Sequence, residues 1–244
     1  PLMLKAAAGH LKCTKRKGQD VLDFIEKLKT SPVDAFPQEK NPYLVFECSM
    51  RELSDKQSAS LCALSIMATD FDRDTACEVG RCTPETIDLF ITLYLIEVDT
   101  YSRRCFWHDV IRAVVAKKLH AGAENLALAW SNYIRHFTAC AKEWSAPFIG
   151  GSGNFAVCYK RFDEEIGHIE AVIRHLLKHE HLHQARCKLS DVLHPRLFVR
   201  LQHDLLMHWF HKVLESAQCE EDKYAEAYAH LGLGDMAYRH SDSN

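Results

Sequence analysis

The segment Trp107-His108-Asp109 places an imidazole and a carboxylate directly before an expected helix over residues 110–119. A short apolar run leads into the pair, and apolar residues then recur at helical spacing up to Leu119. Backbone N–H groups at the start of a helix have no partner within it and attract anions. Two interpretations therefore fit: His108 contacts a phosphate, or His108 and Asp109 only cap the helix.

Histidines form a second candidate group, because four of them fall close to one stripe of an expected helix. These are His168, His175, His179 and His183. The four-residue spacing of His175 and His179 suits a shared metal ion, and more histidines follow on a later helix. The later ones are His203, His208 and His211, with Glu215 as the one acid at matched spacing. We expect a polar helix edge beside an apolar stripe, and no metal site.

Motifs for nucleophilic or phosphoryl-transfer chemistry are missing. The sequence contains neither a G-x-x-x-x-G-K-[ST] loop nor a G-x-S-x-G elbow. Gly150-Gly-Ser-Gly153 is expected to be a linker, since no Gly-Lys pair opens a helix after it. The 10 cysteines are scattered without a C-x-x-C pair, which favours reduced core thiols in a cytosolic protein over a disulfide framework. We expect no ATP hydrolysis by these residues alone.

Composition narrows the classes of partner. The 244 residues are 47% hydrophobic and 26% charged, as in ordinary globular proteins, and the net charge of -3 provides no overall basic field for nucleic acid. No apolar run reaches the roughly 18 residues needed to span a bilayer. The apolar residues 1–8 lack an initial Met and a basic region, so we read them as the interior of a longer protein.

Few glycines and prolines, together with long amphipathic runs, predict a mainly helical chain. Ser54 and Gln57 form a capping box, and Thr83-Pro84 offers a cap followed by proline at the first helical position. Residues 95–98 and 104–107 flank a polar turn and indicate a β-hairpin. Three short helices followed by a hairpin are the order of a winged helix. Its third helix, 85–97, has no Lys or Arg, so we do not expect DNA binding.

Helices are also expected over 123–144 and, with a break at His194-Pro195, from about residue 155 to the end. Four aromatic residues at helical spacing are best explained by core packing: Trp130, Tyr133, Phe137 and Trp144. Residues 225–238 look like the first helix of a tetratricopeptide repeat, with Leu233-Gly234 at its tight contact. Further repeats are expected to follow, because one unit cannot bury its face alone.

Taken in order, these segments resemble the NB-ARC signalling ATPases of the STAND class. Pro1-Leu-Met-Leu-Lys5 is similar to the tail of their G-L-P-L motif, and residues 53–67 are similar to the opening of their winged helix. Trp107-His108-Asp109 resembles their M-H-D motif, with Trp in place of Met. Residues 162–173 resemble the helix that opens the repeat region. The order of the motifs covers nearly the whole chain.

The resemblance implies a mainly α fold in four parts. They are a small helical domain (1–48), a winged-helix domain with a short β-hairpin (49–119), linking helices (120–158) and a tetratricopeptide-like α-solenoid (159–244). It also implies a bound ADP or ATP, with Mg²⁺ in the full-length protein. His108 would contact the β-phosphate and hold the resting state, Pro1 would pack near the adenine, and a P-loop domain would precede the chain.

Two functions remain open. The first is the regulatory half of a cytoplasmic STAND-type switch in innate-immune or apoptosis-like signalling. Its repeats would bind a protein partner, and nucleotide exchange would drive homo-oligomerisation. The second is a helical-repeat scaffold for protein partners without nucleotide dependence. A P-loop upstream of Pro1 would favour the first, and neither function involves nucleic acid or a membrane.

Overall fold

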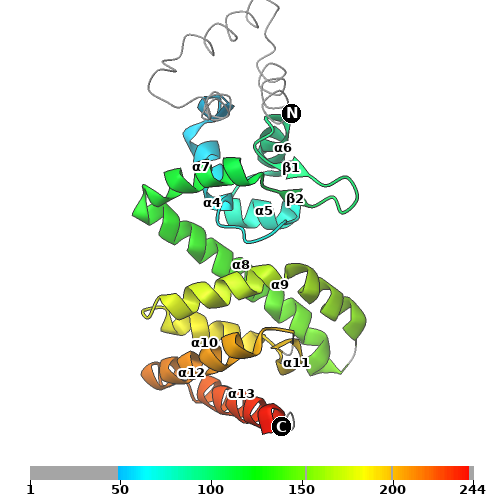
Figure 1. The fold of residues 1–244 in the computed structure, drawn as a ribbon, viewed down its shortest axis with the longest axis vertical. Helices are drawn as coiled ribbons and strands as arrows, with labels where there is room; N and C mark the ends of the chain where they lie inside the picture. Colours follow the sequence, from blue (N-terminus) through cyan, green and yellow to red (C-terminus); the bar gives the residue numbers. More distant parts are fainter. Residues whose placement is uncertain (1–48, 152, 199, 242–244) are drawn as a thin grey trace, which may run out of the picture. The chain divides into compact units, whose positions relative to one another are not determined.

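A computed structural model describes residues 49–151, 153–198 and 200–241 (Figure 1). Over these residues the protein is mainly helical, as the sequence predicts, with one two-stranded antiparallel sheet. The chain divides into two compact units between Asn132 and Tyr133, and each is described separately. Among the described helices we find none that combines the length and the apolarity needed to cross a bilayer.

In the described part of the first unit, from residue 55 on, three short helices follow one another: α4 (Asp55–Leu64), α5 (Arg73–Gly80) and α6 (Pro84–Thr92). The predicted capping box is confirmed, because the Ser54 hydroxyl accepts from the Gln57 N–H and the Gln57 side chain accepts from the Ser54 N–H. Thr83 and Pro84 likewise occupy the predicted cap and first helical positions of α6.

Helix α6 is shorter than the sequence suggests. It ends at Thr92, where Leu93 leaves the helix, and Tyr94 has a φ of 54° that no helix accommodates. The predicted hairpin follows, with strands β1 (Glu97–Val98) and β2 (Cys105–Phe106) paired antiparallel. An isolated bridge joins Phe71 to Cys105 on the outer side of β2. The hairpin is confirmed, with strands of two residues each.

Two further helices follow the hairpin, α7 (Asp109–His120) and α8 (Ala123–Gly150). Helix α7 directs Ile111, Val115 and Leu119 into the core and packs against α4. The largest buried side chains of the first unit come from α4, α6 and the segment between α4 and α5: Leu61, Leu64, Met67, Phe71, Ile87 and Phe90. This core fixes the junction between β2 and α7, where His108 lies.

Helix α8 runs beyond the expected end at Trp144 and includes Pro147. The extension has a role in the second unit, since Ser145 is fully buried and its hydroxyl accepts the His194 N–H at 2.9 Å. Pro147 has no N–H to donate to the Glu143 carbonyl, so α8 lacks one backbone bond shortly before its end at Gly150. Tyr133, Phe137 and Trp144 are buried, as predicted from their spacing.

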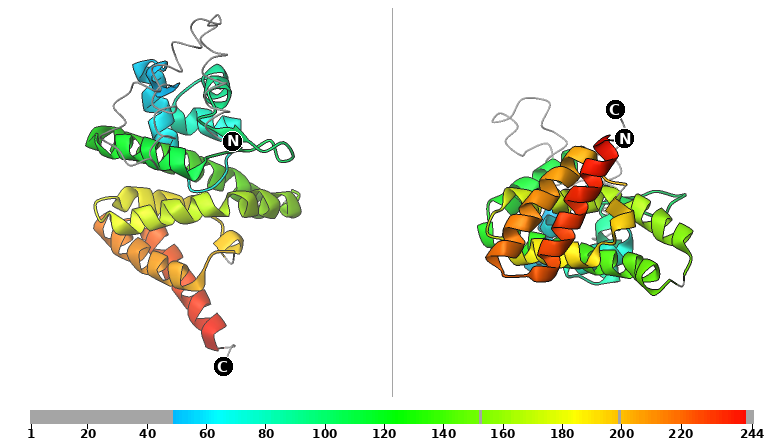
Figure 2. Two further views of the ribbon diagram at one scale, coloured as in Figure 1. Left: turned by 45° about the horizontal axis from the view of Figure 1, so that its top comes forward. Right: turned by 90° about the horizontal axis from the view of Figure 1, so that it is seen from below.

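The second unit continues with five helices. They are α9 (Phe155–Lys178), α10 (His183–Val192), α11 (Pro195–Phe198), α12 (His203–Cys219) and α13 (Lys223–Ser241). Helices α10, α12 and α13 pack against one another, and α9 packs on α12. Figure 2 shows α12 and α13, in orange and red, lying side by side. The predicted break at His194-Pro195 separates α10 from α11.

The closest approach of α12 and α13 differs from the prediction. The tight contact is at Gly232, where a Cβ would lie 2.3 Å from Phe210 Cε1, and not at Gly234, which has nothing within 4 Å. The two glycines are two residues apart, so they point to different sides of α13. The sequence alone does not say which of them faces the neighbouring helix.

Candidate functional site

His108 is the N-cap residue of α7, with an extended backbone (φ -79°, ψ 127°). Its side chain makes no capping hydrogen bond. Its Nδ1 atom is buried and has no hydrogen-bond partner among the residues that the structure describes. A buried ring nitrogen without a partner is unusual, because burying a polar atom without a hydrogen bond is unfavourable. The described residues therefore do not supply the hydrogen bond of this nitrogen, which makes His108 the candidate contact at this turn.

The backbone around His108 is fixed against the end of α4. The Trp107 indole Nε1 donates to the Leu64 carbonyl at 3.1 Å, and Arg112 Nε donates to the Ser65 carbonyl at 3.0 Å. Both carbonyls are at the C-terminus of a helix, where no intrahelical donor reaches them. Trp107 is only 9% exposed and so also fills the core. These two contacts hold the β2–α7 junction from both sides of His108.

Asp109 does not have the capping role that the sequence suggested for it, and it does not orient His108 either. It is the first residue of α7 rather than the cap, and it is exposed. Within the described part of the chain it makes no hydrogen bond or ion pair, so it neither caps α7 nor orients His108. Its carboxylate suits the helix dipole but reduces the attraction of this turn for an anion.

Arg112, one turn after His108, supplies the opposite charge. It is half-buried, and only its Nε has a partner among the described residues. The start of α7 thus combines its first N–H groups, the buried Nδ1 of His108 and the remaining donors of Arg112. Groups of these kinds bind phosphates in proteins. Pro1, the other residue that the resemblance places at a nucleotide, lies outside the described residues.

The histidine stripe of the second unit is interrupted. Helix α9 ends at Lys178, so His179 is its C-cap, and His183 begins α10. His168 is fully buried, with its Nδ1 2.6 Å from the Tyr133 hydroxyl and its ring stacked on Phe137. Over residues 49–151, 153–198 and 200–241, no group of three or more His, Cys, Asp or Glu side chains has the arrangement of a metal site.

Arg186 is a buried residue that the sequence interpretation overlooked. All five of its N–H groups have acceptors: the Ser216 hydroxyl, the carbonyls of Leu176, His179 and Glu180, and Nδ1 of His183. Three of these are carbonyls from the end of α9, so Arg186 caps that helix from α10. The sequence does contain a signal for this burial. Arg186 lies three residues before Leu189 and seven before Leu193, which places it on the same apolar stripe of a helix.

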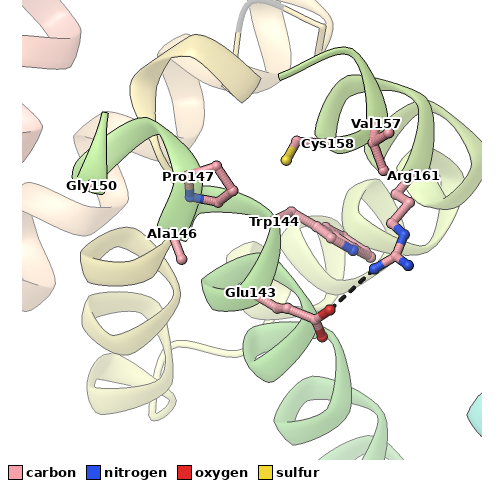
Figure 3. A pocket seen from close by; sticks show the side chains of 8 residues that line it. All are labelled: Glu143, Trp144, Ala146, Pro147, Gly150, Val157, Cys158 and Arg161. Atoms are coloured by element: carbon pink, nitrogen blue, oxygen red, sulfur yellow. Dashed lines mark hydrogen bonds and ion pairs between the residues drawn. The ribbon is translucent and has the colours of Figure 1, made fainter. Parts of the chain in front are cut away.

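Two surface hollows lie in the second unit, and neither contains a catalytic arrangement. The first, of about 390 Å³, lies between α8 and α9 (Figure 3). Its lining residues are Glu143, Trp144, Ala146, Pro147, Gly150, Val157, Cys158 and Arg161. Arg161 forms an ion pair with Glu143 at 3.1 Å beside the Trp144 ring, so the two charges in this lining neutralise each other.

The second hollow, of about 520 Å³, lies between α10 and α12 and is lined by Arg186 and by charged groups of both helices. Lys212 is paired with Glu215 at 2.6 Å, and Arg186 has no donor left for a ligand. The start of α7 is thus the best supported site. Comparison with protein families, curated proteins and solved structures finds no match for this chain.

Proposed function

We propose that this chain is the regulatory part of a STAND-type, nucleotide-dependent signalling switch, in which the start of α7 contacts the phosphates of ADP. One observation carries the proposal: the buried Nδ1 of His108 has no partner in the described residues, at the uncapped N-terminus of a helix. The resemblance of Trp107-His108-Asp109 to the M-H-D motif points to the same residue. An unsatisfied buried nitrogen and a sequence pattern thus support the same residue.

The mechanism is a two-state equilibrium. In the resting state His108 and the first N–H groups of α7 bind the β-phosphate, which favours a closed packing of the winged helix on a nucleotide-binding domain. Trp107 and Arg112 transmit this contact to α4, because each is hydrogen-bonded to its C-terminus. Exchange of ADP for ATP, with Mg²⁺, removes the preference for the closed state. Oligomerisation of the released form then follows.

The proposal limits what these residues do. The P-loop lysine and the Mg²⁺-binding acid would come from an upstream domain, so any ATP hydrolysis belongs to the intact protein. Nucleic acid is not among the proposed partners, since α6 carries Glu85 and Asp88 and no basic residue. A cytoplasmic location and a protein partner bound by the helices of the second unit complete the proposal.

A scaffold without nucleotide dependence is the second candidate, and the outer face of α13 favours it. Tyr224, Leu231 and Tyr238 are spaced by seven residues and are 64%, 65% and 67% exposed. This spacing places them on one side of the helix, as in the seam of a coiled coil. Such a face suits a partner helix. In the switch it would serve the same purpose, so the two candidates differ only in nucleotide dependence.

Nucleotide content of the intact protein distinguishes the two candidates. The protein is purified without added nucleotide and denatured, and the released ADP is quantified for wild type, His108→Ala and His120→Ala. His120 is the control, because it is exposed at the opposite end of the same helix. The switch predicts ADP in the wild type and in His120→Ala, and much less in His108→Ala. An absence of nucleotide from all three proteins would leave the scaffold.

A further inference from the structure

The C-terminal end of α5 brings two cysteines together. Arg81 follows the helix in the left-handed conformation (φ 51°, ψ 48°), and the Cys82 N–H donates to the Cys77 carbonyl at 3.1 Å. This bond between residues five apart is the defining bond of a Schellman motif, in which the side chains at its two ends meet. In this chain both of those side chains are thiols.

The two thiols lie near each other. Each of them shifts the pKa of the other, and the Cys82 thiol faces the Ala76 carbonyl at 3.9 Å. Gly80 leaves room for this arrangement, because a Cβ on it would lie 3.3 Å from Cys82 Sγ. Both cysteines are partly exposed and reduced. A disulfide needs two Cα atoms about 4.4–6.8 Å apart. The bond from the Cys82 N–H to the Cys77 carbonyl brings the two backbones together at this turn.

We propose that Cys77 and Cys82 are a redox-sensitive pair, which a small uncharged peroxide converts into a disulfide across the α5–α6 turn. The proposal does not depend on nucleotide binding. Cys82 directly precedes Thr83, the N-cap of α6, so the disulfide would tie the end of one helix to the start of the next. Because the backbone bond from Cys82 to Cys77 already brings these two residues together, the disulfide would form without unfolding either helix.

The reaction proceeds in two steps. The Cys77 thiolate attacks one oxygen of hydrogen peroxide, the O–O bond breaks, and hydroxide leaves, so that Cys77 becomes a sulfenic acid. The Cys82 thiolate then attacks the Cys77 sulfur, the S–S bond forms, the S–O bond breaks, and a second hydroxide leaves. The two thiol protons convert both hydroxides to water. In total two thiols are oxidised and one peroxide is reduced.

Of the two thiols, Cys77 is the better candidate for the first nucleophile, and its surroundings favour a neutral oxidant. Burial and the carboxylates of Asp74, Glu78 and Glu85 raise the pKa of Cys77, although the neighbouring Cys82 thiol lowers it. Burial and Cys77 raise the pKa of Cys82 to about 12, an effect that Lys56 partly offsets. Oxidation should therefore accelerate as the pH rises. The carboxylates also repel an anionic oxidant such as glutathione disulfide.

Tryptic mapping tests the pair directly, because Arg81 lies between the two cysteines. The reduced protein releases Cys77 in peptide 74–81 and Cys82 in peptide 82–103. After peroxide treatment and blocking of free thiols, we expect one linked species with a mass about 2 Da below the sum of the reduced peptides. Dithiothreitol should restore the two separate peptides, and the same dose of glutathione disulfide should yield less of the linked species.

Variants provide the controls. Cys77→Ser and Cys82→Ser should each abolish the linked species, whereas Cys62→Ser, which removes another partly exposed thiol of the same unit, should leave it unchanged. The wild-type map needs no variant, so a folding defect in a variant does not affect it. Recovery of both peptides unlinked, with sulfinic acid on Cys77, would refute the pair, as would a link from Cys82 to a different cysteine.

Discussion

Arg186 connects three helices of the second unit through one side chain. Its acceptors are a hydroxyl, three carbonyls and an imidazole nitrogen, all of them uncharged. Burial lowers the pKa of its guanidinium, although the group stays protonated because arginine starts from so high a value. Since Nδ1 of His183 accepts from Arg186, the proton of a neutral His183 must be on Nε2.

We predict that Arg186→Met lowers the free energy of unfolding by about 3 kcal/mol, because the carbonyls of Leu176 and Glu180 lose their donor and that of His179 keeps only a backbone N–H. Arg186→Lys should also be destabilising, since a single ammonium cannot reach acceptors on several sides. Unfolding in urea, followed by circular dichroism, measures both changes. The exposed Arg196→Met is the matched control, and an Arg186→Met protein as stable as this control would contradict the capping role.

The lowered pKa of His175 predicts that the stability of the protein depends on pH. Burial, then the neighbours His179, Lys178 and His181, lower its pKa from 6.5 to about 4. The unfolded chain therefore binds a proton at pH values where the folded chain does not. The stability contribution is complete above pH 6.5 and is lost as the pH falls towards 4.

The expected loss from His175 is about 1–2 kcal/mol, after allowance for its half-exposed position. Urea unfolding at several pH values between 4 and 7 measures it. His175→Gln cannot take up the proton, so its free energy of unfolding should fall less steeply over this range. His208→Gln, at an exposed histidine of the same unit, is the control. Equal slopes for His175→Gln and wild type would show that His175 does not cause the effect.

At the scale of elements, the contact between α12 and α13 depends on Gly232. Gly232→Ala places a methyl group 2.3 Å from Phe210 Cε1, so the helices must separate or the ring must move. We predict a loss of about 2–3 kcal/mol in the free energy of unfolding. Gly234→Ala is a matched control on the same helix, with nothing within 4 Å.

The control should itself be neutral or stabilising by about 0.5–1 kcal/mol, because alanine favours a helix over glycine. Thermal and urea unfolding of the two variants make the comparison. If Gly234→Ala proved the more damaging of the two, the register between α12 and α13 described above would be wrong.

Helix starts and the hairpin were predictable from local sequence. Ser54 with Gln57, and Thr83 with Pro84, act within one turn of chain, so neighbours in sequence determine them. The polar turn of the hairpin is equally local: the Asp99 carboxylate accepts the N–H groups of Tyr101 and Ser102, which lowers the pKa of Asp99. The sequence identified these features because they require no distant partner.

Features that depend on distant contacts were not predictable. The end of α9, which separates His179 from His183, depends on Arg186 in the next helix. The same distinction between local and distant contacts applies to the candidate site. The helix start at His108 followed from the sequence, whereas the burial of its Nδ1 depends on contacts with α4, more than forty positions earlier in the chain. No local pattern could indicate those contacts.

At the scale of the whole molecule, the proposed switch assigns a separate task to each of the two units. The first unit carries the phosphate-contact candidate at His108, and the second carries the exposed face of α13. The tasks are thermodynamically linked if a partner and ADP favour different states of the protein. We predict that a saturating partner weakens ADP binding and that ADP weakens partner binding by the same factor. Calorimetric titrations in both orders measure the two factors.

The central claim is that His108 contacts the β-phosphate of ADP. Its most direct test is the affinity of the intact protein for ADP and for AMP, which lacks that phosphate, in wild type, His108→Ala and His120→Ala. We predict that His108→Ala weakens ADP binding by about 10- to 100-fold and AMP binding hardly at all. His120→Ala should bind both nucleotides as the wild type does. Equal losses for ADP and AMP, or no loss for either, would contradict it.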